Sequence, residues 1–407
     1  MAIPIALAFA GAAIDLSRYH AERDRLQDFA DSLALKGARE LPLSSVTDRD
    51  ISNSVSAAAR GLARDTALGE FQISVAVDKQ AASVKIFLTK SAPRSLMLAN
   101  LAPYNQTIRV EAEAVARGGE NVCVVALKPD GESLKTQQFA HISARACAVL
   151  SNSSAKTAIV ATDKSLLEAD LICSAGGFEG DANRFSPKSP MTDCPVYEDP
   201  LAERAPPPVG ACTEFDYEVG FLNSTPGQGS APLITTRLSP GVYCGGLQIH
   251  DLARVEFDPG VYVIKDGPLL VGKNSDLVGD GVGFFLTGDA ATFTFEKNAT
   301  VDLTAPRDGP MAGILFFEDR NAPLERNHTI YSEDARRLLG TFYLPRGALV
   351  IDTQKPVADQ SAYTAIVARR LELLGKPTLV INADYSLTDV PVPSGLGPVG
   401  ADVYLRE

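Results

Sequence analysis

The sequence feature that most constrains the fold is a near-duplicated tetrapeptide. Pro-Gly-Val-Tyr occupies residues 240–243 and recurs 19 residues later at 259–262. Looser versions begin further along, and the glycines that open them are separated by 19, 21, 32 and 27 residues: Gly241, Gly260, Gly281, Gly313 and Gly340. Self-similarity at a nearly regular period is typical of a solenoid. We therefore predict a parallel, right-handed β-helix organised around residues 240–384.

Each predicted coil contains short runs joined by turns. Runs at 261–264, 269–271 and 276–278 are separated by Lys265-Asp266-Gly267 and Gly272-Lys273-Asn274. Gly and Asn tolerate the positive φ that a sharp corner requires. Strands this short cannot bury a face alone, but a neighbouring coil about 4.8 Å away would satisfy their hydrogen bonds. An antiparallel sandwich of short strands is the alternative. The two wider spacings predict inserted loops at 318–327 and 353–360.

Composition limits the possible functions. The 407-residue chain has a net charge of -12 and no long basic run, which argues against nucleic-acid binding. It has no Trp, so a sugar-stacking platform would have to use Tyr or Phe. The six cysteines form no Cys-x-x-Cys pair, so disulfides in an oxidising compartment are a better account than zinc or iron–sulfur ligation.

The pattern of the first 40 residues predicts a helix that begins within a membrane and extends out of it. Residues 1–14 are uncharged and would span only about 21 Å as a helix, short of a hydrocarbon core of ~30 Å. The run lacks the basic start of a signal peptide and continues into a charged pattern. The apolar residues that recur in it at about heptad spacing are Ala12, Leu16, Tyr19, Leu26, Phe29 or Ala30, and Leu33. We expect the exit half of a transmembrane helix, with its other half encoded upstream of Met1.

The same segment carries a family resemblance. Gly11-x-Ala13-x-Asp15-x-x-Arg18 is followed by Leu-Gln-Asp-Phe-Ala-Asp-Ser-Leu-Ala-Leu at residues 26–35. This pattern resembles the N-terminal segment of TadE/TadG-like proteins of the Tad (tight adherence, Flp) pilus-assembly system, although residues 32–33 are Ser-Leu where alanines are usual. The resemblance implies a membrane anchor that packs against other pilus-assembly or pilin-like membrane proteins. The residues that would form this membrane and partner helix are Gly11, Ala12, Asp15, Leu16, Arg18, Leu26, Gln27, Asp31 and Leu33.

Residues 41–119 predict a small α+β unit that resembles a pilin-like module. A helix is expected at 48–67. Strictly alternating residues 71–77 predict a strand whose hairpin partner is 83–88, and 107–115 alternate in the same way. A short helix is expected at 96–101. Arg117-Gly118-Gly119 is a plausible linker to the next domain.

Residues 120–390 are assigned to the β-helix, with an irregular excursion at 176–239 and an extended tail at 391–407. Cys123, Cys147 and Cys173 are 24 and 26 residues apart, close to one coil, so 123–175 are expected to form its first coils. Stacked positions in neighbouring coils come within reach of a disulfide. The favoured pairs are Cys123–Cys147, Cys173–Cys194 and Cys212–Cys244, while Cys147–Cys173 stays open. The Pro-rich excursion followed by Pro-Gly-Val-Tyr-Cys-Gly-Gly resembles the C-terminal region of alphaproteobacterial TadG-like proteins.

A catalytic role is considered because many proteins with a β-helix fold act on polysaccharides. The carboxylates that a hydrolase would need stand at predicted turns, where Asp is expected for conformational reasons, and two Arg-Arg pairs are more typical of solvated edges. The histidines match no metal-ligand spacing. We expect no catalytic or metal site and no cofactor. The candidate side chains are Asp251, Asp258, Asp276, Asp280, Arg336, Arg337, Arg369, Arg370, His20, His141, His250 and His328.

Together these features predict a non-enzymatic component of a Tad-type pilus apparatus. It would be anchored in the inner membrane, with its bulk in the periplasm or at the cell surface and its β-helix acting as a rigid spacer or adhesive body. The alternative is a secreted β-helix enzyme or carbohydrate-binding protein that acts on a polysaccharide.

Overall fold

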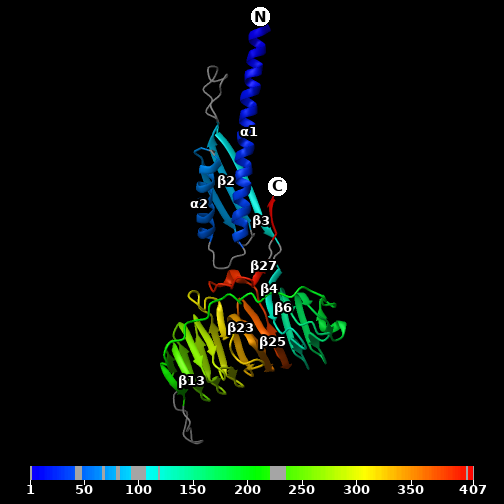
Figure 1. Ribbon diagram of the computed structural model, residues 1–407, viewed down its shortest axis with the longest axis vertical. Helices are drawn as coiled ribbons and strands as arrows, with labels where there is room; N and C mark the ends of the chain where they lie inside the picture. Colours follow the sequence, from blue (N-terminus) through cyan, green and yellow to red (C-terminus); the bar gives the residue numbers. More distant parts are fainter. Residues whose placement is uncertain are drawn as a thin grey trace. The chain divides into compact units, whose positions relative to one another are not determined.

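The computed structural model describes residues 2–41, 48–66, 69–78, 83–92, 107–117, 120–220, 235–399 and 402–406 (Figure 1). The chain divides into two compact units. Unit 1 comprises residues 1–119 and 400–407, and unit 2 comprises residues 120–399. The division after Gly119 falls where the linker was expected. The expected helix at 96–101 lies outside the described residues.

Unit 1 is an α+β unit that contains two helices and an antiparallel sheet. Its sheet has the order β1-β2-β3-β28. The expected hairpin is confirmed, because β1 and β2 pair antiparallel from Gln72–Thr89 to Asp78–Ser83. The elements are α1 (Ala2–Glu40), α2 (Asp48–Thr66), β1 (Gln72–Asp78), β2 (Ser83–Ser91), β3 (Thr107–Arg117) and β28 (Asp402–Arg406).

The core of unit 1 lies between α1, α2 and the sheet. Leu26 and Leu33 of α1 are fully buried in one cluster with Val55 of α2 and Val84 of β2. The helices approach closely at Gly37, where an added Cβ would lie 2.9 Å from a methyl group of Val55 and 3.0 Å from one of Val84. The apolar face of α1 from Leu26 onward is therefore fixed by packing within this chain.

Unit 2 is built mostly from parallel strands, and its last strand, β27, pairs antiparallel with its first, β4. Its first part contains β4 (Glu120–Ala126), β5 (Leu134–Thr136), β6 (His141–Ser151), β7 (Ile159–Ala161), β8 (Leu166–Ser174), β9 (Phe178–Glu179), η1 (Ala182–Arg184) and β10 (Phe185–Ser186). The remainder contains β11 (Glu214–Val219), β12 (Thr235–Leu238), β13 (Gly241–Ile249), β14 (Arg254–Phe257), β15 (Gly260–Lys265), β16 (Leu269–Val271), β17 (Asp276–Gly279), β18 (Val282–Thr287), β19 (Phe293–Phe295), β20 (Thr300–Thr304), β21 (Ile314–Glu318), β22 (Asn327–Ile330), β23 (Asp334–Thr353), β24 (Pro356–Val357), β25 (Thr364–Gly375), β26 (Thr378–Val380), η2 (Tyr385–Leu387) and β27 (Gly397–Val399).

The duplicated tetrapeptide lies on neighbouring strands of this unit, β13 and β15. Their parallel register pairs Gly241 with Tyr262, two residues away from the alignment of the two tetrapeptides. The aromatic residues still meet, since the rings of Tyr243 and Tyr262 stack with centroids 6.0 Å apart. The stack continues through Phe284, Phe316 and Phe342. The repeated motif thus supplies a column of buried rings.

The strands are not stacked in sequence order, which corrects the expected arrangement of the coils. The main ladder runs β11, β13, β15, β18, β21, β23, β25, β4, β6, β8 and β10, with every pairing parallel. Residues 123–175 therefore follow the strand at 364–375 in the ladder instead of preceding the strands at 241–265. The mispredicted link is the long-range pairing of β25 with β4, which joins Ile366 to Val124 and has no signal in local sequence.

Residues 187–213, which we call the strap, connect the two ends of this ladder. The strap begins directly after β10 and ends directly before β11, and Figure 1 shows it in green running across the ladder. The irregular excursion expected at 176–239 is therefore shorter, because β9, β10, β11 and β12 within it join the parallel pairings.

Two apolar clusters explain why many strands of unit 2 are buried on both faces. The larger cluster contains the ring column and Leu and Val residues of neighbouring strands. The second lies on the opposite face, where Leu201 of the strap and Leu396 near the C-terminus join Val242, Phe285 and Phe317. The strap and the segment before β27 therefore cover an apolar sheet face that would otherwise be exposed.

The fold expectation is confirmed in its coarser part. The protein is mainly β and begins with a helix, whereas a right-handed β-helix stays an interpretation of the parallel ladder. The tail at 391–407 contains two strands, of which β27 pairs with β4 and β28 pairs with β3. The inserted loop expected at 318–327 separates β21 from β22, and the one at 353–360 contains β24.

Candidate functional site

The helix that carries the TadE/TadG-like pattern is exposed over part of its length. Ile14 and Leu16 are 54% and 59% exposed, and Arg18 is also exposed. Gly11 and Ala12 lie in the helical backbone of α1, and Asp15 is half-buried. These two large apolar side chains, two residues apart and both exposed to solvent, form a candidate contact surface.

The second half of the pattern has a different role from the one expected. Leu26 and Leu33, expected to face a partner, are fully buried in the core of unit 1. Gln27 Nε2 donates to Asp31 Oδ1 and to the backbone oxygen of Glu111, both at 2.8 Å. These four residues dock α1 onto the sheet of its own chain. The prediction of partner contacts there is corrected, because heptad spacing cannot distinguish an internal face from an intermolecular one.

All six cysteines form disulfides, in the pairing that the sequence analysis favoured. Cys123–Cys147, Cys173–Cys194 and Cys212–Cys244 have Cα–Cα distances of 5.6, 6.1 and 5.7 Å. The first bond joins neighbouring strands β4 and β6 and is buried. The other two join the strap to β8 and β13, so both ends of the strap are covalently fixed.

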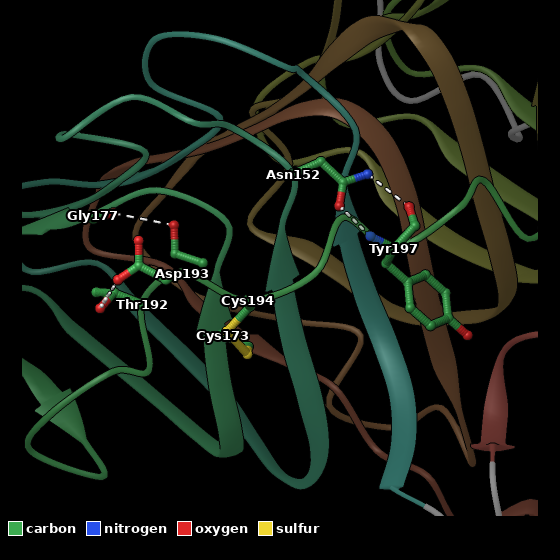
Figure 2. The surroundings of a disulfide bond; sticks show 8 residues. Asn152, Cys173, Gly177, Thr192, Asp193, Cys194 and Tyr197 are labelled. Atoms are coloured by element: carbon green, nitrogen blue, oxygen red, sulfur yellow. Dashed lines mark hydrogen bonds between the residues drawn. A yellow bond between two sulfur atoms is a disulfide. The ribbon is translucent and has the colours of Figure 1, made fainter.

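A pair of hydrogen bonds holds the strap just beyond Cys194. Asn152 Nδ2 donates to the backbone oxygen of Tyr197 at 2.8 Å, and the backbone nitrogen of Tyr197 donates to Asn152 Oδ1 at 2.9 Å (Figure 2). The Tyr197 hydroxyl donates to the backbone oxygen of Gly395 at 2.8 Å. A pocket of ≈ 220 Å³ lies beside this segment and is lined by the Cys173–Cys194 bond, Leu150 and Leu171.

An arginine clamp holds the middle of the strap. Arg320 Nε donates to the Tyr343 hydroxyl at 2.8 Å, and its Nη2 donates to the backbone oxygens of Leu201 and Arg204. The Tyr343 hydroxyl donates to Asp199 Oδ2 at 2.8 Å. Burial and the Asp199 carboxylate raise the pKa of Tyr343, so it remains a neutral donor.

A buried ionic cluster at the end of β21 was not predicted. The Glu318 carboxylate is fully buried and accepts from Arg326 Nη2 at 2.8 Å and from His328 Nε2 at 3.1 Å. Its second oxygen accepts from the backbone nitrogens of Arg346 and Gly347, each at 2.8 Å. Burial alone would raise the pKa of Glu318, but the bonds from His328, Arg326 and Arg346 hold it below the ordinary value. The only sequence signal for this cluster was the charged residue Glu318 at the end of the otherwise apolar strand β21.

The side chains weighed for catalysis have structural partners. Asp258, Asp276 and Asp280 pair with Arg237, Arg254 and Arg307. Asp251 accepts from the backbone nitrogen of Lys273 at 2.7 Å. The arginine pairs are engaged as Arg336–Asp359, Arg337–Asp302, Arg369–Glu325 and Arg370–Glu372.

The histidines are likewise dispersed. His141, His250 and His328 pair with Glu168, Glu218 and Glu318, while His20 is exposed on α1. Burial lowers the pKa of His141 despite the nearby Glu168 carboxylate. Among the described residues, no group of three or more His, Cys, Asp or Glu side chains is arranged to hold a metal ion.

Within the described parts of the chain, none of the helices combines the length and apolar character needed to cross a membrane. These features define a two-unit, disulfide-bonded, mainly β protein whose N-terminal helix is partly exposed. Residues 1–40 match the family described as "Putative Flp pilus-assembly TadE/G-like", which supports a Tad/Flp pilus-associated role. No curated protein and no solved structure matches the chain.

Proposed function

We propose that this protein is a non-enzymatic component of a Tad/Flp pilus assembly or adhesion apparatus, anchored in the inner membrane through its N-terminal segment. The observation that carries the proposal is the TadE/G-like match over residues 1–40, which coincides with α1. Ile14 and Leu16 are exposed, whereas Leu26 and Leu33 are buried in unit 1. The first half of α1 contacts the membrane or other pilus-assembly proteins, and the second half packs the helix against the rest of unit 1.

Unit 2 serves as a rigid extracytoplasmic body whose parallel ladder winds as a right-handed β-helix. Three disulfides, a column of stacked aromatic rings and the Arg320 clamp support a mechanical role. The pairing of three of the four candidate carboxylates with arginines supports a non-enzymatic role, because a hydrolase needs carboxylates directed at a substrate. The disulfides suit an oxidising location in the periplasm or at the cell surface.

The test is a chromosomal double variant, Ile14→Asp/Leu16→Asp, in the organism that encodes the protein. We expect loss of co-purification with pilus-assembly proteins and fewer surface pili in sheared fractions, while unit 1 stays folded. Ser32→Asp, at an exposed position further along α1, is the matched control and should leave both readouts unchanged. Normal pilus assembly in the double variant and in a deletion strain would refute the proposal.

A further inference from the structure

The three disulfides differ in how deeply their cysteine residues are buried. Cys123 and Cys147 are 1% and 0% exposed, and Cys244 is 8% exposed beside a half-buried Cys212. Only Cys173–Cys194, among the three bonds, has both residues half-buried. Because thiol–disulfide exchange requires a thiolate to reach a sulfur, this bond is the most accessible to a reductant.

The chain on the N-terminal side of Cys194 is also attached to β8 by backbone hydrogen bonds. Residues 191–194 are held to β8 by backbone hydrogen bonds: Met191 donates to Ile172 at 2.8 Å, Ser174 to Met191 at 2.9 Å and Cys194 to Ser174 at 3.0 Å. The Met191 side chain is 56% exposed, and Thr192 and Asp193 are exposed as well. Their partners Ile172 and Ser174 are buried, so these three backbone hydrogen bonds are the backbone attachment that remains on this side when the disulfide is cleaved.

The strap beyond this point is held independently. Asn152 fixes the backbone of Tyr197, and Arg320 fixes the backbone oxygens of Leu201 and Arg204. Cleavage of the Cys173–Cys194 bond therefore removes the covalent attachment of residues 187–196 and leaves the attachments of the rest of the strap in place. Figure 2 shows the bond and the Asn152–Tyr197 pair as separate attachments.

Release of this segment would uncover apolar surface. Cys173, Cys194 and Pro195 line the ≈ 220 Å³ pocket together with Leu150 and Leu171, which are half-buried and pack on the apolar cluster under the strap. We propose that Cys173–Cys194 is a thiol-sensitive latch, opened by a dithiol reductant, that controls access to this pocket.

The exchange balances without any further reactant. One thiolate of the dithiol attacks a sulfur of the bond, and the other sulfur leaves as a thiolate and takes up a proton. The second thiol of the reductant then resolves the mixed disulfide. Cys173 and Cys194 together gain two electrons and two protons, and the dithiol is oxidised to an intramolecular disulfide. The latch does not depend on the pilus role proposed above.

The test is graded reduction of the native full chain with dithiothreitol, followed by trapping of free thiols with iodoacetamide and peptide mapping. Alkylation of Cys173 and Cys194 is expected to be roughly tenfold faster, or more, than that of Cys123 and Cys147. It should coincide with greater binding of an apolar dye and with protease cleavage within residues 187–196. Reduction of Cys212–Cys244 first, or equal rates for all three bonds, would overturn the proposal.

Two double variants separate the latch from general loosening. Cys173→Ser/Cys194→Ser should bind the dye without reductant and respond no further to mild reduction. Cys212→Ser/Cys244→Ser, the matched control, should retain the response to reductant. Because alkylation is followed in the unmodified protein, the order of reduction is measured even if a variant fails to fold. Alkylation of Cys173 and Cys194 with no change in dye binding or cleavage would also overturn the gating of the pocket.

Discussion

Replacing Glu318 by Ala should destabilise unit 2 strongly, because it leaves a buried positive charge without its partner. The Glu318 side chain is fully buried, and its partner Arg326 is only 9% exposed. Removing one member of a buried ion pair costs about 3–5 kcal/mol. The backbone nitrogens of Arg346 and Gly347 would also lose their acceptor. We therefore expect a loss of about 4 kcal/mol in the free energy of unfolding.

Two further variants separate the effect of the Glu318 charge from the effects of side-chain volume and of position in the structure. Glu318→Gln keeps the shape and one acceptor oxygen, so it should lose less than Glu318→Ala. Glu325→Ala removes a carboxylate that is 42% exposed and pairs with Arg369 and Lys128, so we expect a loss of about 0–1 kcal/mol. Stability is measured by urea unfolding with the disulfides intact, followed by near-UV circular dichroism of the tyrosines.

The pH dependence supplies an independent check. The folded-state pKa of Glu318 lies below the ordinary Glu value of about 4.3, so its stabilisation is fully present above that pH. The stabilisation is lost as pH falls through the folded-state pKa, so the difference between the wild type and Glu318→Ala should shrink in acid. A Glu318→Ala protein within about 1 kcal/mol of the wild type at pH 7 would refute the assigned role of the cluster.

Three other substitutions test separate parts of the structure. Phe316→Ala should cost about 3–5 kcal/mol in urea unfolding, because this buried ring stacks on Phe284 and Phe342 at 5.1 and 5.2 Å; the 53% exposed Phe139 is the control and should tolerate Ala. Leu26→Asp should lower unit 1 stability by at least about 3 kcal/mol, whereas Leu16→Asp should leave its melting unchanged. Arg320→Ala should cost about 2–4 kcal/mol and increase protease cleavage of the strap near Leu201; an unchanged cleavage rate would contradict the clamp.

The local features of the fold could be predicted well from the sequence. Alternation identified β1 and β3, and a polar turn after β1 indicated β2 as its hairpin partner. Coil-like cysteine spacing favoured Cys123–Cys147, and the two cysteines that flank the return of the excursion were paired as Cys212–Cys244. The order of the ladder could not be read in this way, because Ile366 and Val124 carry no local mark of their pairing. Likewise, Leu26 and Leu33 have the same spacing whether they face a partner or their own sheet. Glu318 and His328, ten residues apart, meet because β21 ends and β22 begins at the same corner of the core.

The proposed anchoring is tested most directly by where the natively expressed protein resides and which face of the membrane it occupies. Membrane fractionation should be combined with protease access in intact cells and spheroplasts, using antibodies to unit 2. We predict a membrane-bound protein whose unit 2 is protected from protease in intact cells and cleaved in spheroplasts, or is accessible at the cell surface together with pili. Soluble protein released into the medium without its N-terminal segment would contradict the proposal and favour a secreted polysaccharide-binding or polysaccharide-degrading role.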